Sequence, residues 1–341
     1  MWGGKGKRRI RMQFVRRSLW SVVIRHWSIL VSLALLTACS FGAEPVVSLM
    51  VQETTLDARV IRHALGETHV PRNPQRVVAL GEEGLLADLL DAGIQPIAAS
   101  VNVPEAVPLL TAAELAGIEL FPSAAQPSLE RIAALQPDLI IGGRFFLEEA
   151  GYAELSRIAP TVALGASDPR QSYVEALTVF GLAERATADV VALEQAVATA
   201  GAHLRAEQRS ISLATIYPGA TLAVWVDGPT SAPLLIRELG FNVRLAAADL
   251  RGVRNGRAFL SNEQIALLDG ELLILLQSDT VDGEAAAVTE FQAQPLWKQI
   301  PAVQNGLVFT LDRLGYPGMR GQRALVADLA ALVQQPAEAL P

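Results

Sequence analysis

The sequence predicts an α/β protein in which two similar doubly wound lobes are joined by one long α-helix. Three observations predict this fold: short apolar runs alternate with helical segments, a purely helical stretch lies in mid-chain, and a repeat spans that stretch. Strand–helix alternation with short loops is typical of a parallel sheet covered by helices. With 341 residues, the chain is long enough for two domains of ~150 residues each.

The N-terminal lobe is assigned to residues 59–170. Its first core strand is predicted at residues 76–80, a short β-branched run between Pro74 and Gly81. A small hairpin over residues 59–71 precedes this strand. The same pattern predicts, in order, helix 85–92, strand 97–99, helix 129–135, strand 139–141, helix 152–158 and strand 161–164.

Residues 171–208 are expected to be helical, because they contain almost no strand signal and are rich in Ala, Leu, Glu and Arg. One helix ends near Phe180, and a second runs from about Glu184 to Gln208. At 1.5 Å per residue the second helix would be about 37 Å long, as long as a whole lobe. Alternation resumes in residues 209–341, the expected C-terminal lobe, with strands at 211–216, 223–226, 272–276 and 307–311 and helices at 232–239, 262–268 and 320–333.

An internal repeat supports the two-lobed prediction. Residues 128–141 align without gaps on residues 261–274, and seven of the fourteen positions are identical. The serine that opens each copy suits a helix N-cap, which puts Glu130 and Glu263 at the second helical position. Two interpretations stay open. Each glutamate stabilises a helix dipole, worth about 0.3–1 kcal/mol when exposed, or the two form docking points, one per lobe, for basic sockets on a partner.

The first forty residues are typical of an export signal. A basic stretch is followed by twelve uncharged residues, 27–38. As a helix these would span about 18 Å, too short for the roughly 30 Å hydrocarbon core of a membrane. Residues 36–39, Leu-Thr-Ala-Cys, look like a bacterial lipobox, in which Cys39 is acylated and becomes the mature N-terminus. We therefore assign residues 1–38 to a lipoprotein signal peptide and 39–58 to a tether. The alternative is a buried free cysteine beside an ordinary signal peptide.

Composition excludes several classes of function. Beyond residue 38 the chain has 20 basic and 35 acidic residues, a formal net charge of −15, which disfavours non-specific binding to nucleic acid. The single cysteine excludes internal disulfides, thiolate zinc sites and iron–sulfur clusters. No Gly-x-Gly-x-x-Gly follows a strand, and neither a phosphate-binding Gly-Lys-Ser/Thr nor a Gly-x-Ser-x-Gly elbow occurs. We therefore expect no catalytic residues, no metal site and no cofactor.

Four segments together resemble the ferric-siderophore receptors of bacterial ABC importers. They are residues 63–80, 128–144, 152–162 and 295–309, so the resemblance runs from about residue 60 to 335. It implies two α/β lobes bridged by one rigid helix, with a ligand cleft between the lobes. It also implies a membrane permease with its ATPase as partner. Glu130 and Glu263 would dock on that permease, where arginines would pair with both oxygens of each carboxylate.

Four residues are expected to contact the ligand. Arg144 follows strand 139–141 after two glycines, at the carboxyl end of a strand, where open α/β sheets bind ligands. Its donors suit the anionic oxygens of a ferric chelate, and the alternative is a solvated loop charge. Trp225 and Tyr217 end strands and Tyr316 lies in a glycine-rich loop, so each offers a stacking or cation–π surface. A place in the core suits Trp225 equally well.

The second lobe offers few further cations for the cleft. Where the resemblance leads one to expect arginines, the chain has Ala232 and Gln277-Ser278, which puts a preference for tris-catecholates in doubt. Arg251, Arg254 and Arg257 stand in the loop before Phe259. They either compensate for that loss or belong to a solvated loop.

The sequence thus predicts a monomeric, exported protein, anchored by lipid alone to the outer face of the cell membrane. It would capture a ferric siderophore and deliver it to the permease of an ABC importer. A haem or cobalamin receptor of the same importer class is the alternative. Haem would need an axial tyrosine or histidine, and Tyr217 and Tyr316 keep that alternative open.

Overall fold

The computed structural model describes residues 49–124, 128–219, 221–226, 231–244, 253 and 256–334. The predicted signal peptide and Cys39 lie outside these ranges. Within the described part of the chain, no helix is both long and apolar enough to cross a membrane.

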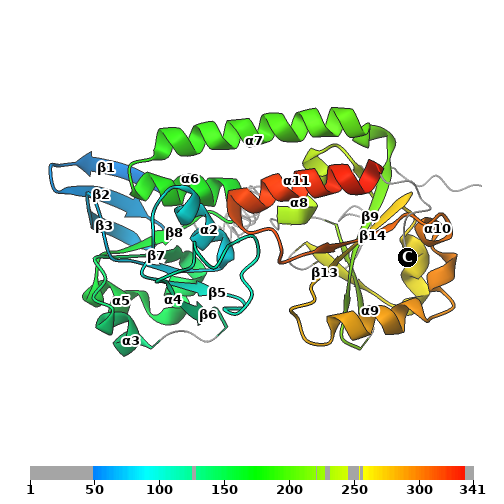
Figure 1. Cartoon of the computed structure of the whole chain (residues 1–341), viewed down its shortest axis with the longest axis horizontal. Helices are drawn as coiled ribbons and strands as arrows, with labels where there is room; N and C mark the ends of the chain where they lie inside the picture. The colour runs from blue at the N-terminus through cyan, green and yellow to red at the C-terminus, as the bar shows by residue number, and fades with distance from the viewer. Residues whose placement is uncertain are drawn as a thin grey trace, which may run out of the picture. The chain divides into compact units, whose positions relative to one another are not determined.

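The first lobe is built on a five-stranded parallel sheet with the strand order β6-β5-β4-β7-β8 (Figure 1). Strands β4 and β8 are buried along their whole length, as expected for a sheet covered on both faces. This burial explains why continuous apolar runs predict the strands. The strands are β4 (Val77–Leu80), β5 (Ala98–Val101), β6 (Glu119–Pro122), β7 (Leu139–Gly143) and β8 (Thr161–Leu164), and the helices are α2 (Glu83–Asp91), α3 (Leu129–Ala134), α4 (Arg144–Ala150) and α5 (Tyr152–Ile158).

A three-stranded antiparallel sheet precedes this lobe in the chain. Its strands are β1 (Met50–Thr54), β2 (Ala58–His63) and β3 (Gly66–Pro71), and the β2–β3 hairpin is the predicted one. Strand β1 lies within residues 39–58, the expected tether, where no strand was predicted. All five side chains of β1 are exposed, so the strand has no alternating apolar pattern and is held by main-chain pairing with β2.

Two helices follow the first lobe, α6 (Pro169–Val179) and α7 (Ala183–Leu204). Helix α7 is the long helix predicted from the sequence, and its 22 residues span about 33 Å. It ends four residues before the predicted Gln208. The cause is Arg205, which adopts a left-handed conformation with φ of 50° and caps the helix, so that residues 206–208 form a separate 3-10 turn.

Helix α7 packs against α6 and also against α8 (Ser231–Glu238) and α11 (Gly318–Gln334), so it contacts elements from both halves of the chain. The close approach of α7 to the end of α8 requires a glycine. A Cβ atom on Gly201 would lie 2.2 Å from the carbonyl oxygen of Leu239, well inside van der Waals contact.

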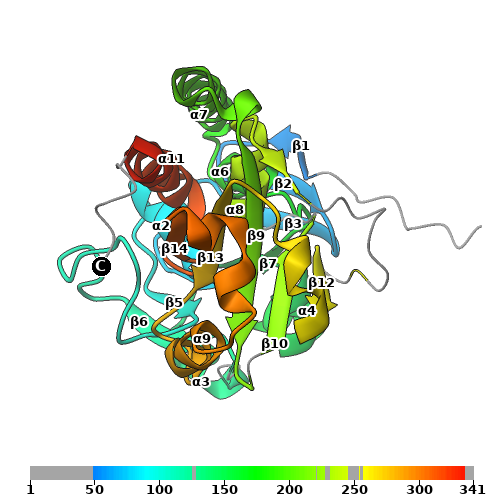
Figure 2. The same cartoon turned by 90° about the vertical axis from the view of Figure 1, so that its right-hand side faces the viewer.

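The second lobe contains a six-stranded mixed sheet (Figure 2). Strands β9, β13 and β14 run parallel, whereas β10 and β12 form an antiparallel edge and β11 pairs with the start of β9. The fold class predicted from sequence is confirmed, but the second lobe is not a fully parallel copy of the first. The helix predicted at 262–268 is a 3-10 helix. The strands are β9 (Ser210–Tyr217), β10 (Thr221–Trp225), β11 (Asn242–Val243), β12 (Arg257–Leu260), β13 (Leu272–Gln277) and β14 (Val308–Asp312), and the helices are η3 (Asn262–Leu267), α9 (Glu284–Gln292), η4 (Trp297–Gln299) and α10 (Pro301–Gln304).

Helix α11 connects the two lobes a second time. It belongs to residues 209–341, the expected C-terminal lobe, yet it packs against α2 and α6 as well as α7 and α8 (Figure 1). At its start the backbone N–H of Met319 donates to Oδ1 of Asp88 on α2 at 2.8 Å. Arg320, one residue later, forms an ion pair with Asp91 of the same helix α2. Two helices, α7 and α11, therefore tie the lobes together.

Candidate ligand-binding cleft

A cavity of about 670 Å³ lies at the carboxyl ends of strands from both sheets. Parallel α/β sheets bind ligands at this edge, because the loops that follow the strands converge there. The volume lies within the range of small-molecule sites. The cleft expected between the lobes is therefore present, and the lining residues that carry charged, polar or aromatic groups include Glu82, Glu83, Asp88, Asn102, Phe146, Trp225, Arg257, Arg313 and Tyr316.

Trp225 forms the apolar part of the second-lobe wall. Its indole Nε1–H donates to Oγ1 of Thr215 at 2.9 Å, and that hydroxyl donates in turn to the carbonyl of Leu276 at 2.8 Å. These bonds satisfy the polar atoms beneath the wall and fix the orientation of the ring. Trp225 therefore belongs to the core and lines the cavity at the same time.

Arg257 is paired with Trp225 in the register of the two antiparallel strands β10 and β12. Its guanidinium carbon lies 5.0 Å from the centroid of the Trp225 ring and 5.7 Å from that of Tyr217, and its Nη1 donates to the Tyr217 hydroxyl. Its Nε is buried without a hydrogen-bond partner, and no carboxylate among the described residues pairs with it. Arg257 is therefore an uncompensated cation held beside aromatic rings in the cavity wall.

Arg313 differs from Arg257 because its charge is compensated. It follows β14 directly, and its Nη2 donates to Oε1 of Glu284, a fully buried residue of α9. The other carboxylate oxygen of Glu284 accepts a hydrogen bond from the backbone N–H of Ser278 at 2.9 Å. This pair fixes Arg313 in the wall and leaves Arg257 as the free cation among the lining residues that the structure describes.

The first-lobe wall is acidic. Glu83 accepts hydrogen bonds from the backbone N–H of Asn102 at 2.6 Å and from its Nδ2 at 2.8 Å. The neighbouring Glu82 is exposed, and within the described ranges its carboxylate has neither a hydrogen-bond nor an ion-pair partner. Desolvation by the surrounding protein and, to a lesser extent, the charge of Glu83 raise the pKa of Glu82.

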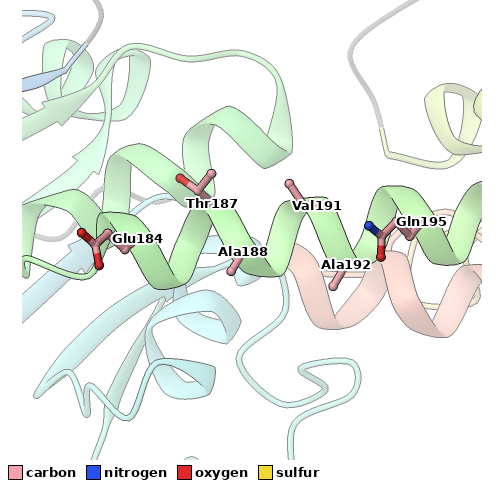
Figure 3. Close-up of a pocket in the computed structure, with 6 residues that line it drawn as sticks. All are labelled: Glu184, Thr187, Ala188, Val191, Ala192 and Gln195. Carbon is pink, nitrogen blue, oxygen red and sulfur yellow. The ribbon is translucent and has the colours of Figure 1, made fainter.

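A second, more open hollow runs along α7 (Figure 3). Its lining comes from this one helix, all six side chains are exposed, and Glu184 is the one charged group among them. Because no polar groups converge there from other elements, the hollow lacks the features of a small-molecule site. The six residues are Glu184, Thr187, Ala188, Val191, Ala192 and Gln195.

Comparison with known proteins identifies the family. The sequence model of the periplasmic binding protein family matches residues 111–313, more than half of the chain. The chain belongs to the periplasmic binding protein family. It is similar to the putative ABC transporter substrate-binding lipoprotein YhfQ of Bacillus subtilis, at 29% identity over 265 residues, which cover 74% of this chain and 80% of YhfQ. The Fe(3+)-citrate-binding protein YfmC of the same species is 27% identical over 277 residues, 78% of this chain and 82% of YfmC.

The fold of this binding protein also matches solved structures. Staphylococcus aureus SirA, solved in complex with staphyloferrin B, aligns with a TM-score of 0.67 at 23% sequence identity. The alignment covers 84% of this chain and 100% of that chain. It supports the two-lobed α/β architecture.

The aromatic residues predicted to contact ligand are placed unequally around the cavity. Trp225 and Tyr316 line it. The Tyr316 hydroxyl, however, donates to Oδ2 of Asp328 on α11 at 2.8 Å and is thereby occupied within the protein. Tyr217 is not among the lining residues and instead accepts the hydrogen bond from Arg257. The ligand roles of all three stay predictions.

Arg144 lies beside the cavity rather than in its lining. It is the first residue of α4, and its Nε forms an ion pair with Oε1 of Glu148 one turn later, at 2.9 Å. Gly143 and Phe146 on either side of it do line the cavity. As predicted, Arg144 directly follows a parallel strand, β7. It also begins helix α4, in which its side chain is exposed. Its ligand role stays a prediction.

Of the two glutamates of the repeat, the structure describes the side chain of Glu130. Glu130 is exposed at the second position of α3, where the side chain of the N-cap residue Ser128 accepts the backbone N–H of Arg131 at 3.2 Å. Glu263 occupies the second position of η3 after the N-cap residue Ser261, and its side chain lies outside the described part of the structure. Their docking role and the acylation of Cys39 stay predictions.

Both tyrosines offered as axial haem ligands form a hydrogen bond within the protein. The Tyr217 hydroxyl accepts a hydrogen bond from Arg257, and the Tyr316 hydroxyl donates one to Asp328. Burial, and then the bond to Asp328, raise the pKa of Tyr316 and so disfavour a phenolate. Among the side chains described, no group of three or more His, Cys, Asp or Glu residues could hold a metal ion.

Sequence reasoning missed Glu82 and Arg313 and misplaced Arg257. Glu82 and Arg313 follow β4 and β14, which pair in parallel with their neighbours, so the rule that selected Arg144 also applies to them. Arg257 lies in strand β12 rather than in the loop before Phe259. The other two arginines of that cluster, Arg251 and Arg254, lie outside the described residues.

Proposed function

We propose that this periplasmic binding protein captures a ferric siderophore in the cleft between its lobes and delivers it to the permease of an ABC importer. The observation that carries the proposal is the guanidinium of Arg257 beside Trp225 in the cavity wall, which pairs with no carboxylate of the described residues. Ferric chelates present negatively charged oxygens around the metal, and arginine can contact several such oxygens at once. The aromatic ring beside it offers a flat surface for the organic part of the chelate.

The relatives support this choice of ligand class. YfmC is named a Fe(3+)-citrate-binding protein, and SirA was solved with staphyloferrin B. A haem ligand receives less support from the two candidate axial tyrosines, because Tyr217 does not line the cavity and the Tyr316 hydroxyl donates to Asp328. The iron would arrive as part of the cargo, and we propose that the protein works as a monomer without a resident cofactor and without catalysis.

The second part of the proposal concerns export, membrane anchoring and docking on the permease. The basic and apolar segment before Cys39 would direct export, and acylation of Cys39 would hold the protein at the outer face of the membrane. YhfQ is itself named a lipoprotein. Glu130 and Glu263 would then meet arginines of the permease, one from each lobe.

Tryptophan fluorescence tests the ligand class directly. Residues 46–341 form one compact unit and contain two tryptophans, Trp225 in the cavity wall and Trp297. With Trp297→Phe as background, the remaining emission reports on Trp225. We expect saturable quenching by a ferric hydroxamate, catecholate or citrate chelate below micromolar concentration. Saturation by haemin or cobalamin alone would move the ligand to another class, and no response to any of them would contradict the proposal.

A further inference from the structure

Within the described ranges, the two walls of the cleft carry opposite charges that have no ion-pair partner. Glu82 on the first-lobe wall has an exposed carboxylate that accepts no hydrogen bond from any residue the structure describes. Arg257 on the second-lobe wall has no carboxylate partner within the same ranges, and its Nε is buried without an acceptor. A ligand that fills this cavity therefore meets a free anion on one side and a free cation on the other.

The other charged residues of the lining have partners within the protein, although Nε of Arg313, like that of Arg257, is buried without an acceptor. Glu83 receives two hydrogen bonds from an asparagine, and Arg313 is paired with a buried carboxylate. Asp88 is buried, which favours its neutral form, and its Oδ1 accepts a hydrogen bond from the backbone N–H of Met319 at 2.8 Å. Among the lining residues that the structure describes, Glu82 and Arg257 are therefore the two charged groups that no neighbouring residue pairs with, and a ligand can compensate them.

The surroundings of Glu82 disfavour further negative charge. Glu82 is next to Glu83 in the chain, and both residues belong to the cavity lining. A chelate with only anionic groups at its surface would add repulsion at this wall. An ammonium group would instead form an ion pair with a charge-assisted hydrogen bond, which is the stronger kind.

We propose that Glu82 is a specificity-determining residue that selects ferric chelates carrying a pendant ammonium group. The anionic oxygens around the iron face Arg257, and the ammonium nitrogen donates to the Glu82 carboxylate. This inference rests on the proposed function, because it requires a ferric chelate in the cleft. The inference specifies the charge on the part of the ligand that does not bind iron. It also predicts weak binding of strongly anionic tris-catecholates.

A matched pair of ligands isolates the effect of the ammonium group. Ferrioxamine B is a hydroxamate chelate with one ammonium group, and its N-acetyl derivative has the same iron centre without that charge. Isothermal titration of the full chain in detergent, with ferric citrate as a third ligand, measures all three affinities. We expect the unmodified protein to bind ferrioxamine B at least about ten-fold more tightly than the acetylated form, as for the loss of one charge-assisted bond.

Two variants assign the preference to one side chain. Glu82→Gln keeps the shape of the residue, and the Glu82 side chain makes no capping bond to α2, so the fold should persist. In this variant the two ferrioxamines should bind equally, within about two-fold. Glu67→Gln, which changes an exposed carboxylate on β3, is the control and should keep the full preference.

The outcomes separate this inference from the proposed function. Equal binding of both ferrioxamines by the unmodified protein, or a preference that survives in Glu82→Gln, would overturn the role of Glu82. Binding of ferric citrate without either ferrioxamine would also overturn it, while the proposed function would stand. Binding of none of the three, nor of any other ferric chelate, would overturn the proposed function and this inference with it.

Discussion

Arg170 joins three helices from both halves of the chain, so its removal is expected to cost measurable stability. From α6, its Nε donates to Oε1 of Gln322 on α11 at 3.0 Å. Its two terminal nitrogens bind the two carboxylate oxygens of Glu238 on α8, and Nη1 lies 3.8 Å from Glu194 on α7. The side chain of Arg170 is only 9% exposed, so water cannot replace these partners while the helices stay packed.

The magnitude follows from what Arg170→Met would leave behind. The buried oxygen of Gln322 would lose its donor, which costs about 1–3 kcal/mol. Breaking a fully buried ion pair costs about 3–5 kcal/mol, but Glu238 is 32% exposed and water can partly solvate it, so we assign about 1 kcal/mol to that loss. Methionine keeps the apolar stem. The expected loss is therefore about 2–4 kcal/mol in the free energy of unfolding.

Urea denaturation followed by circular dichroism measures this loss. The matched control is Arg157→Met, which breaks an ion pair with Glu154 whose side chains are 75% and 47% exposed. Exposed pairs of this kind are worth about 0–1 kcal/mol, so the control should change stability little. Equal losses in the two variants, or a loss below about 1 kcal/mol for Arg170→Met, would refute the argument from burial.

Three further predictions concern the helix interface, the long helix and the permease. Burial raises the pKa of Asp88 to about 8, so folding favours the protonated acid and stability should fall as the pH rises from about 4 to about 8. Asp88→Asn should remove this slope from urea midpoints measured across that range, and an unchanged slope would exclude Asp88 as its origin. Gly201→Ala would bring a Cβ atom to 2.2 Å from the carbonyl oxygen of Leu239, so the free energy of unfolding should fall by about 1–3 kcal/mol in thermal or urea unfolding. The control Thr187→Ala, at an exposed position of α7, should lower it by less than about 0.5 kcal/mol. Replacing both Glu130 and Glu263 by Ala should leave ligand affinity unchanged and abolish uptake into vesicles that hold the permease, and retained uptake would disprove their docking role.

Much of the fold is predictable because its signals are local. Strands β4, β7 and β8 of the first lobe are short, largely apolar runs that end at or before glycine, and α7 is a long stretch without strand signals. The end of α7 was misjudged because Arg205 in a left-handed conformation interrupts a sequence that is still helical in composition. Strand β1 was missed because its exposed side chains carry no pattern and its partner strand supplies the main-chain bonds.

The site was less predictable than the fold because its partners are distant in sequence. The difference between Arg257 and Arg313 depends on Glu284, a buried carboxylate that pairs with one arginine and not with the other. No local pattern shows that pairing. Likewise, Arg257 meets Trp225 through the register of an antiparallel edge that the parallel alternation does not predict.

The affinity of Arg257→Gln for the ferric chelate that binds most tightly tests the central claim most directly. Loss of a hydrogen bond to a charged group costs about 1.5–3 kcal/mol, so Kd should rise about 10- to 150-fold. Arg157→Gln, which changes an exposed arginine of α5 outside the cavity lining, should leave Kd unchanged. An Arg257→Gln variant that binds the chelate within two-fold of the unmodified protein would contradict the account of the cleft.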